Sequence, residues 1–186
     1  MIKKFELDLS SKITVFGIEL FRVKASISFG NVKEGELGGY IAKEGNLSHS
    51  GNAWVYGDAR VYGDARVYGD AMVSGDAEVS GDARVYGNAM VSGNARVYGD
   101  ARVYGDAMVS GDAEVSKLND HIVFKNSWSS GRYFTYTRSN QKWRVGCFYG
   151  TSEELIKKAY QDSEDSGRHY EAYVNFVKTL EALDDK

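Results

Sequence analysis

The sequence predicts a mainly β protein built around a left-handed parallel β-helix, and three observations lead to that prediction. Eleven uninterrupted copies of the hexad G-[DN]-A-x-V-[YS] run from Gly51 to Ser116. Ala and Val stand two positions apart, so an extended strand points both side chains to the same side. Gly followed by Asp or Asn is typical of a tight corner. Three such hexads make a triangular coil with a narrow Ala and Val interior, and the chain returns to each face every eighteen residues.

Residues 1–50 are predicted to form an N-terminal β cap. Polar and apolar residues alternate through residues 1–30, which predicts two or three strands. The segment GNLSHS at 45–50 keeps the hexad rhythm, with Leu47 in the place of Ala and His49 in the place of Val. A cap is expected because an open coil edge would pair with another chain.

Residues 51–116 are the predicted β-helix, and residues 117–186 are predicted to form a compact C-terminal α+β domain of a hairpin and two helices. The segment RYFTYTRSNQKWRVGCFYG predicts two strands around a Ser-Asn turn. Thr151-Ser-Glu-Glu154 matches a capping box that begins a helix. A second helix is expected from about Arg168, with apolar side chains along one face at Tyr170, Tyr173, Val177 and Leu180.

Composition excludes several classes of protein. The 186 residues carry a net charge of −3, and the repeat body has five Arg against eight Asp and two Glu, which is not the pattern of a conventional nucleic-acid binder. The single cysteine, Cys147, allows no internal disulfide and favours a reducing compartment. The N-terminus lacks an apolar signal core, and no run reaches membrane-spanning length. We therefore expect a cytoplasmic protein with no membrane partner.

The variable positions of the hexads sort into three faces when every eighteenth residue is read together. The first face is uncharged and predicts an interface for a homo-dimer or trimer, unless the protein's own cap covers it; it carries Trp54, Met72, Met90 and Met108. The second face alternates in charge and predicts a salt-bridge ladder with a structural role; it carries Arg60, Glu78, Arg96 and Glu114.

The third face is the predicted partner-binding surface. It carries the arginines Arg66, Arg84 and Arg102, followed two residues later by Tyr68, Tyr86 and Tyr104. Like charges one strand apart repel by about 1 kcal/mol per pair in water, so something should offset them. One explanation is pairing with Asp64, Asp82 and Asp100, aided by stacking of the guanidinium groups on the tyrosines. The other is an anionic partner, either an acidic protein surface or a phosphate-bearing ligand.

No catalytic residue, cofactor site or metal site is predicted. The hexads resemble the left-handed β-helix superfamily, which includes acyltransferases that use a histidine and γ-class carbonic anhydrases that hold a metal through three histidines. The eleven hexads contain no histidine; His49, His121 and His169 all lie in the flanks without ligand or acid–base spacing. The corner Asp residues differ in spacing from the nonapeptide repeats that bind calcium, and their role in the turn explains them.

A closer resemblance covers nearly the whole chain. The segment FGNVKEGELGGYIAKEGNLSHSGNAWVYGDARVYG resembles the opening of phage- and prophage-associated hexapeptide-repeat proteins, and FTYTRSNQKWRVGCFYGTSEELIKKA is similar to their C-terminal domain. The resemblance implies a protein of a phage or mobile element, and because the residues hold no catalytic constellation we expect a non-catalytic binding protein, such as an anti-defence inhibitor. Its partner would be a host protein, such as a component of the immune machinery, or a nucleotide signal. Two alternatives stay open: an acyl- or nucleotidyltransferase-like enzyme, and a self-assembling scaffold.

Overall fold

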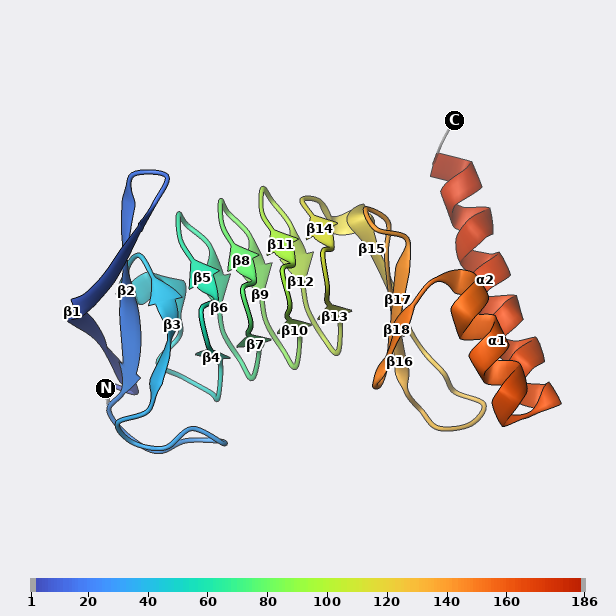
Figure 1. Cartoon of the computed structure of the whole chain (residues 1–186), viewed down its shortest axis with the longest axis horizontal. Helices are drawn as coiled ribbons and strands as arrows, with labels where there is room; N and C mark the ends of the chain where they lie inside the picture. Colours follow the sequence, from blue (N-terminus) through green and yellow to red (C-terminus); the bar gives the residue numbers. More distant parts are fainter. Residues whose placement is uncertain (1–2, 185–186) are drawn as a thin grey trace.

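A computed structural model describes residues 3–184 and shows a β-solenoid of about four turns with a folded segment at each end (Figure 1). Each hexad contributes one two-residue strand, and the strands form three faces. The first face contains β4 (Trp54–Val55), β7 (Met72–Val73), β10 (Met90–Val91) and β13 (Met108–Val109). The second contains β5 (Arg60–Val61), β8 (Glu78–Val79), β11 (Arg96–Val97) and β14 (Glu114–Val115). The third contains β6 (Arg66–Val67), β9 (Arg84–Val85) and β12 (Arg102–Val103).

Strands on one face pair in parallel, and each lies opposite the strand eighteen residues further along, as Met90 does to Met72 and to Met108. The Ala and Val residues of all eleven hexads are fully buried, which confirms that they fill the interior. Glycine is required at the corners because the backbone there is left-handed and close to the next coil. At Gly81, φ is +66° and an added Cβ would lie 3.0 Å from the backbone nitrogen of Gly99.

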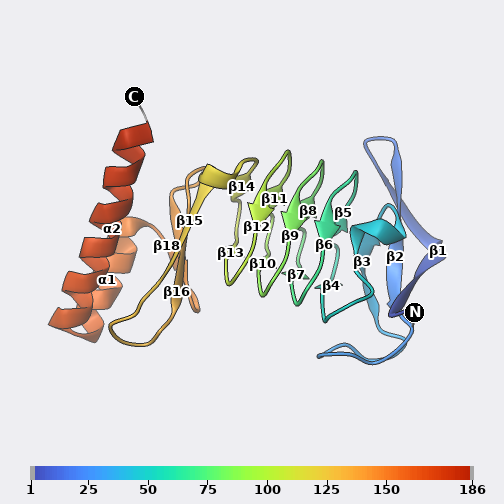
Figure 2. The same ribbon diagram turned by 180° about the vertical axis from the view of Figure 1, so that it is seen from behind.

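The N-terminal segment extends the second face. The strands β1 (Phe5–Val15) and β2 (Ile18–Ala25) form an antiparallel hairpin. The strand β3 (Leu37–Ile41) pairs antiparallel with β2 and parallel with β5, so one seven-stranded sheet runs from β1 to β14. Figure 2 shows from behind how β1 to β3 cover the end of the solenoid.

The corner between Leu47 and β4 corrects our interpretation of residues 45–50. Leu47 lies opposite Val67, twenty residues later, whereas Val55 lies opposite Val73, eighteen residues later. The corner between Leu47 and Val55 therefore holds two residues more than the corner between Val67 and Val73. Leu47 consequently takes the place of a Val and not of an Ala, and His49 lies in the enlarged corner, where its ring stacks on Phe5 with the centroids 4.2 Å apart.

Side chains replace the missing neighbouring coil at both ends of the solenoid. Within it, N–H groups of one coil donate to carbonyls of the next, so the first coil has spare carbonyls and the last has spare N–H groups. At the N-terminal end, the Lys4 ammonium donates to the carbonyls of Gly51 (3.2 Å) and Ala53 (2.8 Å). Asn46 belongs to the 3₁₀ turn η1 (Glu44–Asn46), and its amide donates to the carbonyls of Gly63 (3.1 Å) and Ala65 (2.8 Å).

At the C-terminal end of the solenoid, backbone N–H groups donate to side-chain hydroxyls. The Met108 N–H donates to Thr135 (2.9 Å), and the Glu114 N–H donates to Ser139 (2.7 Å).

Lys4 predicts an unusual dependence of stability on pH. Its side chain is 2 % exposed, and burial lowers its pKa from the ordinary 10.5 to about 8, although the charge of Asp70 opposes the shift. Between these two pKa values the unfolded chain holds the proton more tightly than the folded chain does. The free energy of unfolding should therefore rise as the pH rises from about 8 towards 10, by up to about 3 kcal/mol over the full shift.

Urea unfolding across this pH window measures the effect. The variant Lys4→Met lacks the ammonium group at position 4, so its stability should change less over the same window. A wild-type profile no steeper than that of Lys4→Met would contradict the prediction.

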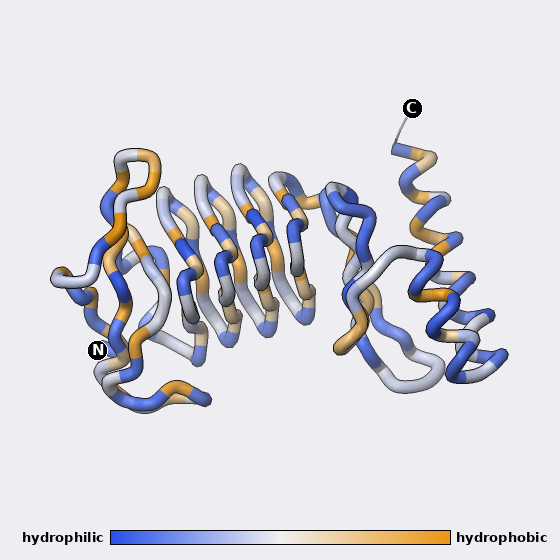
Figure 3. The backbone as a smooth tube through the Cα atoms, viewed as in Figure 1, coloured by the Kyte–Doolittle hydropathy of each residue, from blue (hydrophilic) through white to orange (hydrophobic). Residues whose placement is uncertain are grey.

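The C-terminal segment is a four-stranded antiparallel sheet with two helices packed against it (Figure 1). After the 3₁₀ turn η2 (Leu118–Asp120), the sheet contains β15 (His121–Lys125), β16 (Tyr133–Thr137), β17 (Lys142–Val145) and β18 (Phe148–Gly150). The predicted hairpin is β16 and β17, and the two outer strands were not expected. The helices are α1 (Ser152–Asp162) and α2 (Glu164–Asp184), and Figure 3 shows polar and apolar positions alternating along them. None of the described helices is both long and apolar enough to span a bilayer.

The first residues of the two helices can be compared with the helix starts that the sequence predicts. The predicted capping box is confirmed: the Thr151 hydroxyl accepts from the Glu154 N–H, and the Glu154 carboxylate accepts from the Thr151 N–H. The second helix begins at Glu164, four residues before the predicted Arg168. The reason is Ser163, the one residue between the helices, whose hydroxyl accepts from the Ser166 N–H at 3.0 Å and caps the first turn.

Candidate binding surface

The third face presents two parallel columns of side chains, which we call the Arg–Tyr face. Arg66, Arg84 and Arg102 lie opposite one another on β6, β9 and β12, and all three are exposed. The rings of Tyr68, Tyr86 and Tyr104 stack, with centroids 4.9 and 5.3 Å apart and nearly parallel planes. A rigid sheet thus holds three guanidinium groups beside a continuous aromatic column.

Neither the corner aspartates nor the tyrosines neutralise the charge of the arginine column. Within residues 3–184, no side chain forms an ion pair or hydrogen bond with the guanidinium group of Arg66, Arg84 or Arg102. Asp64 instead pairs with Lys43 at 2.7 Å, and this contact is the main reason that the pKa of Asp64 is lowered. The tyrosine rings stack on one another rather than under the guanidinium groups.

A groove of about 720 Å³ opens at the N-terminal end of the Arg–Tyr face. Its lining includes Arg66, Tyr68 and Arg84, together with Glu44, Gly45, Leu47 and residues 48–50 of the enlarged corner. The groove exists because the first coil lacks both columns. Asn46 precedes Leu47 as Arg66 precedes Val67, but its side chain is turned inward, where its amide donates to the Ala65 carbonyl. Ser48, which donates to the Val67 carbonyl as Tyr68 does to that of Val85, has a small side chain.

Arg66 and Arg84 supply the positive charge of the groove. His49 is neutral at pH 7, since burial lowers its pKa below the ordinary 6.5. Its Nδ1 accepts from the Lys4 backbone N–H at 3.2 Å, which places the proton of the neutral ring on Nε2. Among the described residues, Glu44 is the one acidic side chain that lines the groove. It pairs with Lys3 at 2.6 Å, and that hydrogen bond lowers the pKa of Glu44.

Trp54 does not belong to an exposed interface, which corrects one expectation for the first face. It is 0 % exposed and packs edge-on against Phe29 and Phe5, with centroids 5.4 and 6.3 Å away. The protein's own N-terminal segment therefore covers the head of this face, as the alternative interpretation held. The three methionines remain half-buried on the surface, at Met72, Met90 and Met108.

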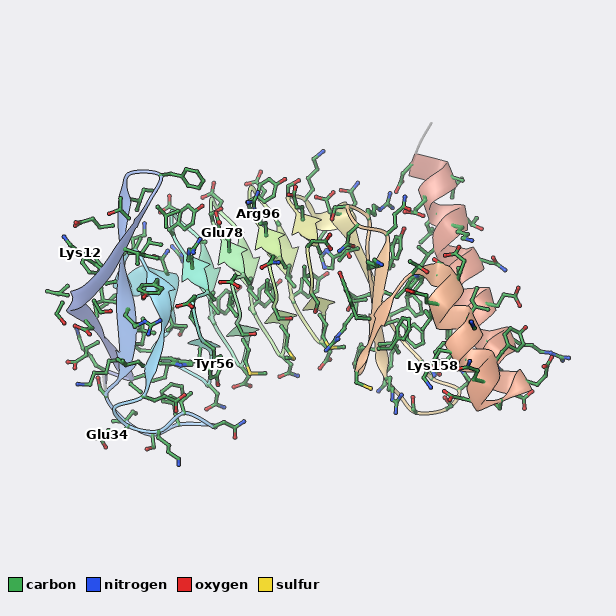
Figure 4. All side chains as sticks on the ribbon, in the orientation of Figure 1. Lys12, Glu34, Tyr56, Glu78, Arg96 and Lys158 are labelled. Atoms are coloured by element: carbon green, nitrogen blue, oxygen red, sulfur yellow. The ribbon has the colours of Figure 1, made fainter. Side chains whose placement is uncertain are left out.

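The second face forms only part of the predicted ladder. Among the described residues its one ion pair joins Arg96 and Glu114 at 3.8 Å, on neighbouring strands. The glutamates also accept from tyrosine hydroxyls, Glu78 from Tyr62 and Glu114 from Tyr98. Figure 4 labels Glu78 and Arg96, which project from adjacent coils on this face.

The three histidines lie on separate parts of the fold. His49 is in the N-terminal corner, His121 is buried at the start of β15, and His169 stacks on Trp128 in the C-terminal segment with centroids 3.7 Å apart. Burial lowers the pKa of His121 as well. Across residues 3–184, no three His, Cys, Asp or Glu side chains gather as a potential metal site.

Sequence analysis missed the groove, although it did identify Arg66, Arg84 and Tyr68. The signal was present in the hexad at 45–50, which departs from the repeat at both of its inward positions. From sequence alone this segment is indistinguishable from a weakened hexad in regular register. The two extra residues became visible only from the pairing of Leu47 with Val67.

Comparison with known proteins supports the repeat architecture. A family model described as the YdcK beta solenoid repeat matches residues 65–81, 77–93, 83–99, 89–103 and 101–116. These matches overlap within the hexads and cover less than half of the chain. No curated protein matches the sequence. The matches and the structure together identify the chain as a β-solenoid repeat protein.

Proposed function

We propose that this β-solenoid repeat protein is a non-catalytic binding protein whose Arg–Tyr face binds an anionic partner. The observation that supports the proposal is the column of Arg66, Arg84 and Arg102, which are exposed and unpaired within the described residues. The resemblance to phage-associated proteins adds the context of a phage or mobile element. The partner would then be a host protein with an acidic surface, such as a component of the bacterial immune machinery.

The physical basis is the rigidity of the face. Guanidinium groups form bidentate hydrogen bonds with carboxylates and phosphates, and strands about 4.8 Å apart present them in a fixed row. Because the sheet already holds these groups in place, little ordering accompanies binding. The tyrosines add flat contact area and hydroxyl groups. We also infer from the hexads that the coil is left-handed, with three hexads per turn.

Two other functions remain as alternatives. A transferase-like enzyme would need a catalytic base, and the hexads hold no histidine; saturable binding of acetyl-CoA would favour this alternative. A self-assembling scaffold would need open ladder edges. Lys4 and Asn46 occupy the first edge, and the hydroxyls of Thr135 and Ser139 occupy part of the last, which favours a protein that does not polymerise through its ends.

A homo-dimer or trimer through the half-buried methionines is part of the proposal. Met72, Met90 and Met108 form an uncharged strip on neighbouring coils, and such strips favour contact with another surface. The mass of the protein in light scattering would show the assembly.

The variant Arg84→Gln tests the binding surface against a matched control. Arg84 and Arg96 are both exposed, and both stand at the same position of their hexads. Arg84→Gln should weaken capture of the partner from a bacterial lysate by about tenfold or more, because it removes a charge-assisted contact. Arg96→Gln should leave capture nearly unchanged. Capture by the wild type should also weaken as salt rises, because charge complementarity acts mainly on the association rate.

The melting temperatures of the two variants should be nearly alike, since both side chains lie on the surface. Equal capture by both variants, or a greater loss with Arg96→Gln, would show that the arginine column is only part of the scaffold.

A further inference from the structure

We propose that the groove at the N-terminal end of the Arg–Tyr face binds a mononucleotide, with its base stacked on Tyr68 and its phosphate held by Arg66 and Arg84. This inference rests on the proposed function, because it uses two of the same arginines. It assigns to this end of the face a small anionic ligand that carries both a planar ring and a phosphate.

The first argument is the interrupted tyrosine column. Tyr68 stacks on Tyr86 with centroids 4.9 Å apart and planes inclined by 2°. On its other side the column position belongs to Ser48, whose backbone is placed like that of a column tyrosine. The groove lies beside this serine. A flat heterocycle seated there would continue the stack where the fourth ring is missing, and such base–aromatic stacking contributes about 1–3 kcal/mol.

The second argument is the charge of the groove. Arg66 and Arg84 lie on paired strands, so their guanidinium groups project side by side into the same groove. Neither has a partner among residues 3–184. Two adjacent forks of N–H donors match the oxygens of a phosphate better than a single carboxylate. Glu44 does not cancel this charge, because Lys3 pairs with it.

The third argument is shape. The groove volume of about 720 Å³ lies within the roughly 300–1,000 Å³ typical of small-molecule sites. Residues 48–50 of the enlarged corner line one side of the groove. The acidic balance of the repeat body, five Arg against eight Asp and two Glu, disfavours a long nucleic acid.

Isothermal titration calorimetry with AMP tests the proposal, with adenosine and ribose 5-phosphate as ligands that each lack one half. We expect saturable binding of AMP at least tenfold tighter than of either half. Arg66→Gln and Arg84→Gln should each weaken AMP binding by about tenfold or more. Arg102→Gln is the matched control, since Arg102 stands in the same column but does not line the groove; it should change AMP affinity less than about threefold.

The variant Ser48→Tyr tests the stacking position directly. It should complete the tyrosine column, keep the melting temperature of the wild type or raise it, and abolish AMP binding. If Ser48→Tyr does not fold, the arginine variants still decide the question. The proposal is overturned if AMP does not bind, if either half binds as tightly, or if Arg102→Gln loses as much affinity as Arg84→Gln. Tighter binding of a 5′-phosphorylated oligonucleotide than of AMP would also overturn it.

The failure of this inference and the failure of the proposed function give different results. If AMP does not bind but capture from lysate still depends on Arg84, the groove assignment is wrong and the binding face stands. If neither ligand binding nor capture depends on Arg84, both are wrong.

Discussion

Replacing Trp54 with alanine is expected to lower the free energy of unfolding by about 3–5 kcal/mol, the usual cost of removing a large buried aromatic side chain. Trp54 is 0 % exposed, because Phe5 and Phe29 of the N-terminal segment cover its ring at the head of the first face. The cavity cannot close easily, because the ring also lies against the backbone of β3. A Cβ added at Gly38 would come within 2.8 Å of the Trp54 ring.

Trp128→Ala is the matched control, since Trp128 is 36 % exposed and stacks on His169 at the surface. It should cost less than about 1 kcal/mol in the same urea titration. Trp54→Ala distinguishes a buried Trp54, whose loss lowers stability, from an exposed Trp54 in an oligomer interface, whose loss lowers the mass of the assembly. A Trp54→Ala protein with wild-type stability but a lower mass in light scattering would restore the interface interpretation.

The interior of the solenoid could be predicted from sequence because its physics is local and repeated. Ala and Val two residues apart must point the same way in a strand, and Gly is needed where the backbone turns left-handed. Eleven repetitions leave little freedom in this pattern. The same regularity placed Arg66, Arg84 and Arg102 in one column and the three tyrosines beside them.

The ends of the solenoid could not be predicted, because they depend on contacts between segments far apart in the chain. Trp54 looked exposed from its hexad position, and nothing in that hexad indicates that Phe5 and Phe29 cover it. Lys4 reads as an ordinary surface cation near the N-terminus. Its role as a donor to Gly51 and Ala53 follows only from how β1 folds back over the first coil.

The groove arises from a small departure from the repeat. A regular hexad at 45–50 would place an arginine and a tyrosine over Arg66 and Tyr68 and close the face. The actual sequence turns Asn46 inward and leaves Ser48 on the surface. The proposed site therefore lies where the two columns stop, and a search for the most regular positions would pass over it.

Asn46→Ala should be as damaging as the loss of Trp54, although it removes far fewer atoms. Asn46 is fully buried, and its side chain satisfies three backbone groups: the carbonyls of Gly63 and Ala65 accept from its amide, and the N–H of Lys43 donates to its oxygen at 2.9 Å. Each buried backbone group left without a partner costs about 1–3 kcal/mol. We expect a loss of about 3 kcal/mol or more in the free energy of unfolding.

Two further variants test whether the hydrogen bonds of Asn46, rather than the mere loss of an asparagine, cause the destabilisation. Asn94→Ala removes an exposed asparagine of a regular hexad and should change stability by less than about 0.5 kcal/mol. Asn46→Asp keeps the shape and the bond from Lys43 but points a carboxylate oxygen at two carbonyls, so it should destabilise at least as strongly as alanine above pH 5, where a carboxylate is ordinarily ionised. If Asn46→Asp were as stable as the wild type, donation to the Gly63 and Ala65 carbonyls would not be what stabilises the N-terminal edge of the third face. The packing of Leu47 alone would then have to stabilise that edge.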